Sequence, residues 1–164
     1  MAFDPAMSFF LVGSDRTALA VVRSLLQQLD ATSVEDATNA ADAFTKMRIK
    51  RYGLVISDWR IEPITGCDFV RKMRSDPLIS RTPFIMTGES RFEHVVAAKN
   101  AGANCYIVKP FSAQTLKSKI EAALATRSSF LERQQSALQP GKDRASVATR
   151  AGRVKFEGVF TTTW

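Results

Sequence analysis

The sequence has 164 residues, which is enough for one domain with a hydrophobic core and an additional segment. Its 45% hydrophobic and 24% charged residues are usual for a soluble globular protein, and no apolar run reaches the roughly 18–20 residues of a membrane-spanning helix. The net charge of +7 is uneven, because residues 127–164 hold 7 Lys or Arg against 3 Asp or Glu, whereas residues 1–126 hold 16 against 13.

Five short apolar runs alternate with five helical patterns along the first 126 residues. The expected strands are 9–12, 33–36, 54–57, 83–86 and 105–108, and the expected helices are 17–29, 39–50, 67–75, 92–101 and one that begins at 112. The second strand is the least regular of these elements. Strand–helix alternation predicts a parallel sheet with helices on both faces, because each right-handed crossover between parallel strands needs a helix.

The centre of this pattern is the stretch 52–66, which reads YGLVISDWRIEPITG. Its apolar strand ends at Asp58, and a loop with Pro63 and Gly66 follows. Ligands of open α/β sheets bind beyond the carboxyl ends of the strands, so Asp58 stands where chemistry is expected. Taken alone, Asp58 could equally be a cap of the following turn.

Polar residues also follow three of the other strands: Asp15 the first, Thr87 the fourth and Lys109 the fifth. A parallel sheet brings all these ends to one edge. Two neighbouring carboxylates repel, and a hard divalent cation relieves the repulsion. A lysine and a hydroxyl are groups that hold phosphoryl oxygens. The set predicts a carboxylate, Asp58, that accepts a phosphoryl group beside Mg²⁺, with Gly88 leaving room for it.

Three motifs at these strand ends carry a family resemblance: VISDW (55–59), FIMTG (84–88) and CYIVKPF (105–111). With them, residues 8–126 resemble a response-regulator receiver domain of two-component signalling, and are most similar to the single-domain chemotaxis type. Trp59, Tyr106 and the sequence SAQTL add to the match. The resemblance implies a flavodoxin-like, doubly wound, five-stranded parallel sheet of order 2-1-3-4-5 with helices on both faces.

The resemblance also implies roles for particular residues. Asp58 would accept a phosphoryl group from the phosphohistidine of a sensor histidine kinase or phosphotransfer protein. Asp15, Asp58 and the backbone carbonyl of Arg60 would bind Mg²⁺. Lys109 would bridge Asp58 and the phosphoryl group, and the Lys109–Pro110 bond would be cis. The protein would be a signalling module that assists its own phosphorylation and dephosphorylation, not an enzyme.

Thr87 and Tyr106 would form a switch pair, in which Thr87 moves toward the phosphoryl group and vacates space for Tyr106. The surface made of 91–101, 105–108 and the last helix would then change its affinity for a downstream target protein. The same surface could form a homodimer. We expect a cytoplasmic location and no contact with a membrane.

Six residues near the expected site depart from the family pattern or could modify the site. Ser14 stands where a second acidic residue is usual, which predicts weaker Mg²⁺ binding. Ile61-Glu62-Pro63 replaces the usual Met-Pro, so the loop after Asp58 could differ in shape. Arg60 and Glu89 could pair across the mouth of the site and hinder water, or could simply be solvated.

Two other readings of the chain stay open. The first is a receiver-like scaffold that signals without phosphorylation, which Ser14 favours. The second is nucleic-acid binding through the basic extension 127–164, which is less expected than a solvated segment. In that extension, residues 128–138 could prolong the last helix, 139–141 would end it, and 154–160 alternates like a strand.

The remaining reactive side chains have ordinary explanations. Cys67 and Cys105 are too few for a disulfide framework and lack metal-ligating neighbours, so both are expected to be buried hydrophobic residues. His94 is the only histidine and is expected to be exposed on its helix.

Overall fold

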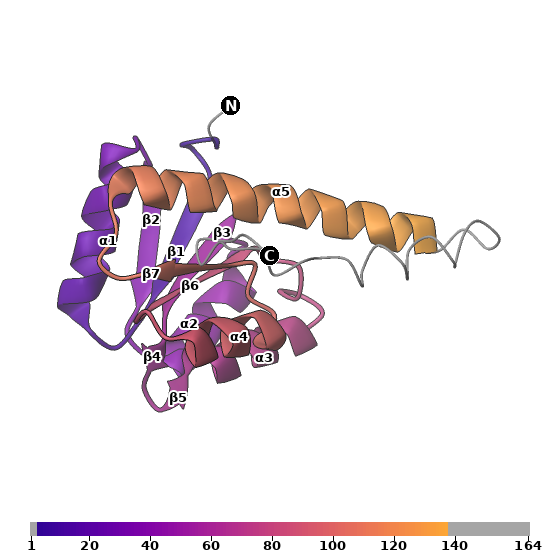
Figure 1. Cartoon of the computed structure of the whole chain (residues 1–164), viewed down its shortest axis with the longest axis horizontal. Helices are drawn as coiled ribbons and strands as arrows, with labels where there is room; N and C mark the ends of the chain where they lie inside the picture. Colours follow the sequence, from indigo (N-terminus) through magenta and orange to yellow (C-terminus); the bar gives the residue numbers. More distant parts are fainter. Residues whose placement is uncertain (1–2, 138–164) are drawn as a thin grey trace.

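A computed structural model describes residues 3–137 of the chain, and its centre is a five-stranded, fully parallel sheet (Figure 1). The strands run in the order β2-β1-β3-β6-β7, which is the predicted order 2-1-3-4-5. Their bounds are β1 Ser8–Val12, β2 Ser33–Ala37, β3 Leu54–Asp58, β6 Phe84–Gly88 and β7 Cys105–Val108. All five predicted strands are therefore confirmed to within two residues.

Five helices cover the two faces of this sheet. They are α1 Arg16–Gln28, α2 Ala40–Ile49, α3 Gly66–Ser75, α4 Phe92–Ala101 and α5 Ala113–Ala137. In Figure 1, α5 lies along one side of the sheet, and α2, α3 and α4 lie on the other. The predicted helical continuation beyond residue 127 is present up to Ala137. The basic segment that follows it, with the strand-like patch 154–160, lies outside the described residues.

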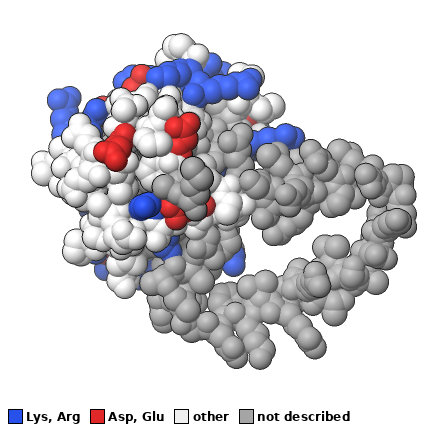
Figure 2. All heavy atoms as spheres, turned by 90° about the horizontal axis from the view of Figure 1, so that it is seen from above, with Lys and Arg blue, Asp and Glu red and all other residues white. Residues whose placement is uncertain are grey.

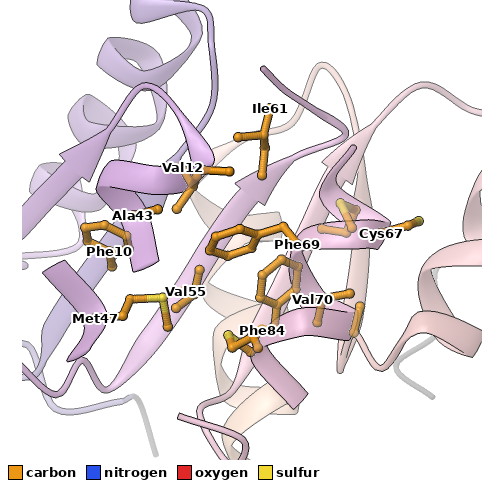
Figure 3. Close-up of a cluster of buried hydrophobic side chains, with 14 of the residues drawn as sticks. Phe10, Val12, Ala43, Met47, Val55, Ile61, Cys67, Phe69, Val70 and Phe84 are labelled. Carbon is orange, nitrogen blue, oxygen red and sulfur yellow. The ribbon is translucent and has the colours of Figure 1, made fainter. Parts of the chain in front are cut away.

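Successive side chains of a strand point to opposite faces, and this alternation divides the interior into two cores. Phe9, Leu11 and Ile56 pack in the core that α1 and α5 cover. Phe10 and Val55 pack in the other core, under α2, α3 and α4 (Figure 3). Because both faces are covered, the central strands β3 and β6 begin with apolar residues on both faces and become polar only toward their carboxyl ends.

Local sequence signals set the helix ends. The side chains of Asp15, Asn39 and Thr65 accept hydrogen bonds from the first turns of α1, α2 and α3. Gly102 ends α4 in a left-handed conformation with φ of 113°, which a glycine adopts without steric cost.

The loop after Asp58 holds an element that the sequence did not predict. Arg60–Ile61 (β4) and Ile64–Thr65 (β5) form a two-stranded antiparallel ribbon around a cis Glu62–Pro63 bond. Ile61 is buried, and the Gly66 N–H donates to the Trp59 carbonyl at 2.7 Å. Strands of two residues are too short for hydrophobic periodicity to detect. The ribbon fixes the backbone beside the predicted site.

The surface of the described part carries charges of both signs. Figure 2, which looks onto the molecule from above the view of Figure 1, shows acidic side chains among uncharged ones and basic side chains gathered mainly along one border. Within residues 3–137, no helix combines the length and the hydropathy needed to cross a bilayer.

Candidate functional site

The centre of the site is the Asp58 carboxylate at the end of β3. Its Oδ1 lies 2.9 Å from Lys109 Nζ and accepts a hydrogen bond from the Trp59 N–H at 2.7 Å. Asp58 lies opposite Thr87 in the β3–β6 register, and the Asp58 side chain is only 19% exposed. The structure thus brings together three of the four side chains that the strand ends predicted.

Lys109 reaches Asp58 across an intervening strand. Its backbone N–H donates to the Gly88 carbonyl at 2.8 Å, which continues the β6–β7 ladder by one residue. The Lys109–Pro110 bond is cis, as the resemblance implied. Lys109 therefore holds one oxygen of Asp58, while Oδ2 accepts no hydrogen bond within the described part of the chain. A carboxylate with one free oxygen beside a cation is suited to nucleophilic attack on an anionic centre.

A pocket of about 400 Å³ opens beside this carboxylate. It is larger than a phosphoryl group requires and is bounded by both aromatic and charged side chains. The residues that line it are Asp58, Trp59, Arg60, Gly88, Glu89, Arg91, His94 and Lys109. With three cationic side chains against two anionic ones, the pocket is suited to an anionic ligand.

The predicted switch pair lies next to this pocket. Thr87 is buried, and its hydroxyl donates to the Ser57 carbonyl at a long 3.4 Å. Tyr106 is also buried, and its hydroxyl donates to the backbone carbonyl of Glu89 at 2.7 Å. A Cβ on Gly88 would collide with the Tyr106 hydroxyl. Gly88 therefore makes room for the Tyr106 hydroxyl, and it also lines the pocket where the sequence predicts room for a phosphoryl group.

Burial raises the pKa of Tyr106 to about 12, with a smaller contribution from the negative charges of Glu89 and Asp58. The pKa of Tyr52, the other tyrosine, is also raised, first by burial and then by its hydrogen bond to Glu35. A phenol whose pKa is raised on folding favours the folded state below its unfolded pKa of about 10. That contribution is lost as the pH rises through the folded-state pKa.

We therefore expect the folded protein to show little phenolate absorbance at a pH of about 10.5, where most tyrosines of a urea-unfolded sample are ionised. A spectrophotometric titration of both samples measures this difference. Ionisation of half the tyrosines of the folded protein near pH 10 would contradict it.

The predicted metal ligands, Asp15, Asp58 and the Arg60 carbonyl, all offer oxygen atoms. Oδ1 of Asp15 already accepts from the backbone N–H groups of Thr17 and Ala18, at 2.9 and 3.3 Å. The Arg60 carbonyl lies 3.5 Å from both the backbone nitrogen and the hydroxyl of Ser14. Among the described residues, no group of three or more His, Cys, Asp or Glu side chains is arranged to hold a metal ion. Oxygen ligands fit Mg²⁺. Because Ser14 precedes Asp15, these ligands include one carboxylate fewer than two adjacent acidic residues would supply.

Of the two alternatives for Arg60 and Glu89, the described residues do not show the pairing, and the expected exposure of His94 is wrong. Glu89 forms its ion pair with Arg91, at 3.1 Å, and not with Arg60. Arg91 comes two residues after Glu89, so the local turn favours it over a residue from another loop. His94 is half-buried and not exposed, because the first turn of α4 faces the pocket.

Sequence reasoning also missed a ring contact in the pocket wall. The imidazole of His94 stacks on the indole of Trp59, with ring centroids 3.9 Å apart and an interplanar angle of 7°. No motif signals this contact, since it depends on the rotation of α4 about its axis. Cys67 and Cys105 are buried and free, as predicted.

Comparisons with known proteins agree with this geometry. Residues 9–121 match the response regulator receiver domain family. The chemotaxis protein CheY of Pseudomonas aeruginosa is 32% identical over 116 residues, which are 70% of this chain and 94% of CheY. CheY-3 of Vibrio cholerae is 31% identical over 70% of this chain and 89% of its own length.

Solved structures show the same fold. CheY4 of Vibrio cholerae superposes with a TM-score of 0.66 at 28% identity, over 73% of this chain and 99% of CheY4. A response regulator of Chloroflexus aurantiacus reaches 0.69 at 25% identity, over 73% and 98% of the two chains. The receiver domain of a sensor histidine kinase from Pseudomonas aeruginosa PAO1 has magnesium coordinated in its active-site cleft; it superposes with a TM-score of 0.66 at 21% identity, over 73% and 98%.

Proposed function

Because the chain belongs to the response regulator receiver domain family, we propose that it is a phosphorylation-dependent signalling module whose acceptor is Asp58. The donor is the phosphohistidine of a sensor histidine kinase or of a phosphotransfer protein, and the reaction takes place in the cytoplasm. The observation that carries this proposal is the Asp58 carboxylate, which has one oxygen held at 2.9 Å from Lys109 and the other free beside a cationic pocket.

The transfer follows from this arrangement. Oδ2 of Asp58 attacks the phosphorus, the P–N bond of the donor breaks, and the departing imidazole keeps the bonding electrons and takes up a proton. The barrier arises mainly from the repulsion between the carboxylate and the phosphoryl group, which are both anionic. Catalysis therefore consists of positioning the two groups and neutralising their charge. Lys109 lies close enough to neutralise both the carboxylate and the incoming oxygens.

Asp15, Asp58 and the Arg60 carbonyl are the groups that would hold Mg²⁺ at this site. A bound Mg²⁺ would supply positive charge against the anionic oxygens of the phosphoryl group. Because Ser14 contributes no carboxylate, we expect weak binding of the ion.

The variant Ser14→Asp tests this expectation. It would place a carboxylate against the Arg60 carbonyl, which the Ser14 hydroxyl now approaches. We expect Mg²⁺ affinity to rise roughly tenfold, since one added charge near a divalent cation in an aqueous dielectric contributes about 1–2 kcal/mol. The fluorescence of Trp59 during an Mg²⁺ titration measures it, in proteins that also carry Trp164→Phe so that Trp59 is the sole tryptophan. The uncharged Ser14→Asn is the matched control. Equal affinities of the two variants would contradict the placement of Ser14 at the metal site.

The phosphoryl group would act on its surroundings through the switch pair. Among the described residues, the Thr87 hydroxyl makes one hydrogen bond, the long one to the Ser57 carbonyl, so a phosphoryl oxygen would be a stronger partner for it. Its movement would give Tyr106 a new position and change the surface of α4, β7 and α5, where a downstream target protein or a second copy would bind.

Incubation with acetyl phosphate and Mg²⁺, followed by intact mass measurement, tests the proposed function. Wild type is expected to gain one phosphoryl group, and Asp58→Asn is expected to gain none. A scaffold that signals without phosphorylation is the second candidate, and Ser14 is the observation that favours it. An unmodified wild type under these conditions would support that candidate.

A further inference from the structure

The stacked rings of Trp59 and His94 form a wall of the Asp58 pocket. One ring follows the acceptor residue directly, and the other belongs to the first turn of α4. Nδ1 of His94 is buried and has no hydrogen-bond partner among the described residues. The structure therefore shows that contact between the ring faces fixes the imidazole, and not a hydrogen bond through Nδ1.

The backbone of Trp59 is fixed independently of this contact. Its N–H donates to Asp58 Oδ1 at 2.7 Å and to the Thr87 carbonyl at 2.9 Å, and its carbonyl accepts from the Gly66 N–H. The freedom that remains to Trp59 is rotation of the indole about its side-chain bonds. His94 restricts that rotation, because it covers one face of the indole.

We propose that His94 is a positioning residue, which holds the Trp59 indole over the pocket and thereby slows the loss of phosphate from Asp58. The inference rests on the proposed function and adds a residue that controls how long Asp58 stays phosphorylated. In the step that is slowed, a water oxygen bonds to phosphorus and the bond between phosphorus and the Asp58 oxygen breaks. The carboxylate regains the electron pair, and the water gives its proton to the solvent.

The charged residues at the same pocket are less suited to this task. Glu89 and Arg91 pair with each other, and their side chains are 65% and 64% exposed. Exposed ion pairs are weakly held and are screened by salt. The ring stack is half-buried and does not depend on charge, so it forms the more persistent barrier to water.

The test compares His94→Ala, which removes the ring, with His94→Phe, which keeps a ring but lacks Nδ1. All variants also carry Trp164→Phe, so that Trp59 is the sole tryptophan. Asn100→Ala, an exposed position of the same helix, is the matched control. Each protein is phosphorylated with acetyl phosphate, freed of the donor, and followed by intact mass as the phosphoryl group is lost.

We expect His94→Ala to lose phosphate about five times faster than wild type, as the loss of one aromatic pair in the barrier would predict. Its Trp59 emission should shift to longer wavelength and become more accessible to acrylamide. His94→Phe and Asn100→Ala should match wild type in lifetime. If His94→Ala folds poorly, Trp59→Ala serves in its place and should also lose phosphate faster than wild type. The double variant of Trp59 and His94 should lose phosphate no faster than Trp59→Ala alone.

Equal lifetimes of His94→Ala and wild type would overturn the role of His94, and so would a fast loss from His94→Phe. Both results would leave the proposed function intact, because they require a phosphorylated protein. A wild type that takes up no phosphate would instead overturn the proposed function, and the role of His94 with it.

Discussion

Replacing Lys109 with alanine is expected to lower the initial rate of phosphorylation by about 100-fold or more, the usual cost of removing a group that stabilises developing charge. Lys109 Nζ lies 2.9 Å from Asp58 Oδ1, and no other cationic side chain of the described chain pairs with that carboxylate. Without the ammonium, the phosphoryl group and the carboxylate approach each other with their charges less balanced. The rate is measured by intact mass during incubation with acetyl phosphate and Mg²⁺.

Two controls separate charge from geometry in this experiment. Lys109→Arg keeps the positive charge on a larger, planar group, so its rate should fall less than that of Lys109→Ala. Lys72→Ala removes an exposed lysine of α3 and should leave the rate unchanged. A Lys109→Ala variant that is phosphorylated within about twofold of the wild-type rate, well under the usual effect, would show that Lys109 does not assist the reaction.

Replacing Arg74 with methionine is expected to lower the free energy of unfolding by about 3 kcal/mol, because four half-buried acceptors lose their donor. The guanidinium donates to the carbonyls of Gly102, Ser80 and Thr82 at 3.0, 2.8 and 2.6 Å, and to Asn104 Oδ1 at 2.8 Å. It thereby joins α3 to the loop before β6 and to the end of α4. Burial lowers the pKa of Arg74 to about 10, so the side chain is still charged at neutral pH.

Urea denaturation measures this loss of stability. Arg71→Met is the matched control, because Arg71 lies on the same helix, is 55% exposed and pairs with Asp68 of the preceding turn. It should change the free energy of unfolding by no more than about 0.5 kcal/mol. If Arg74→Met changed the free energy of unfolding as little as Arg71→Met, the hydrogen bonds of Arg74 would not contribute to stability as expected.

The strand pattern was enough to predict the sheet and its edge of polar residues. Apolar runs of four or five residues separated by amphipathic helices allow few other folds, and the carboxyl ends of parallel strands must meet at one edge. Asp58 and Lys109 could therefore be placed together from the amino-acid sequence alone. The order of the strands came from the resemblance to receiver domains, since periodicity does not determine it.

Contacts that depend on loop shape or helix rotation could not be predicted. The pairing of Glu89 with Arg91 follows from a turn whose geometry the sequence does not state. The stacking of Trp59 and His94 requires α4 to present its first turn to the pocket, and neighbouring positions of a helix differ by about 100° in direction. Side-chain contacts of this kind decide which residues modify the site, whereas strand ends decide where the site lies.

Locating the phosphoryl group on the chain tests the central claim most directly. Wild-type protein phosphorylated with acetyl phosphate and Mg²⁺ is treated with borohydride, which reduces an aspartyl phosphate to homoserine, and is then digested for peptide mass mapping. We expect homoserine at position 58 and at no other aspartate. Homoserine at Asp15 or at another residue, or an adduct that survives in Asp58→Asn, would contradict the account.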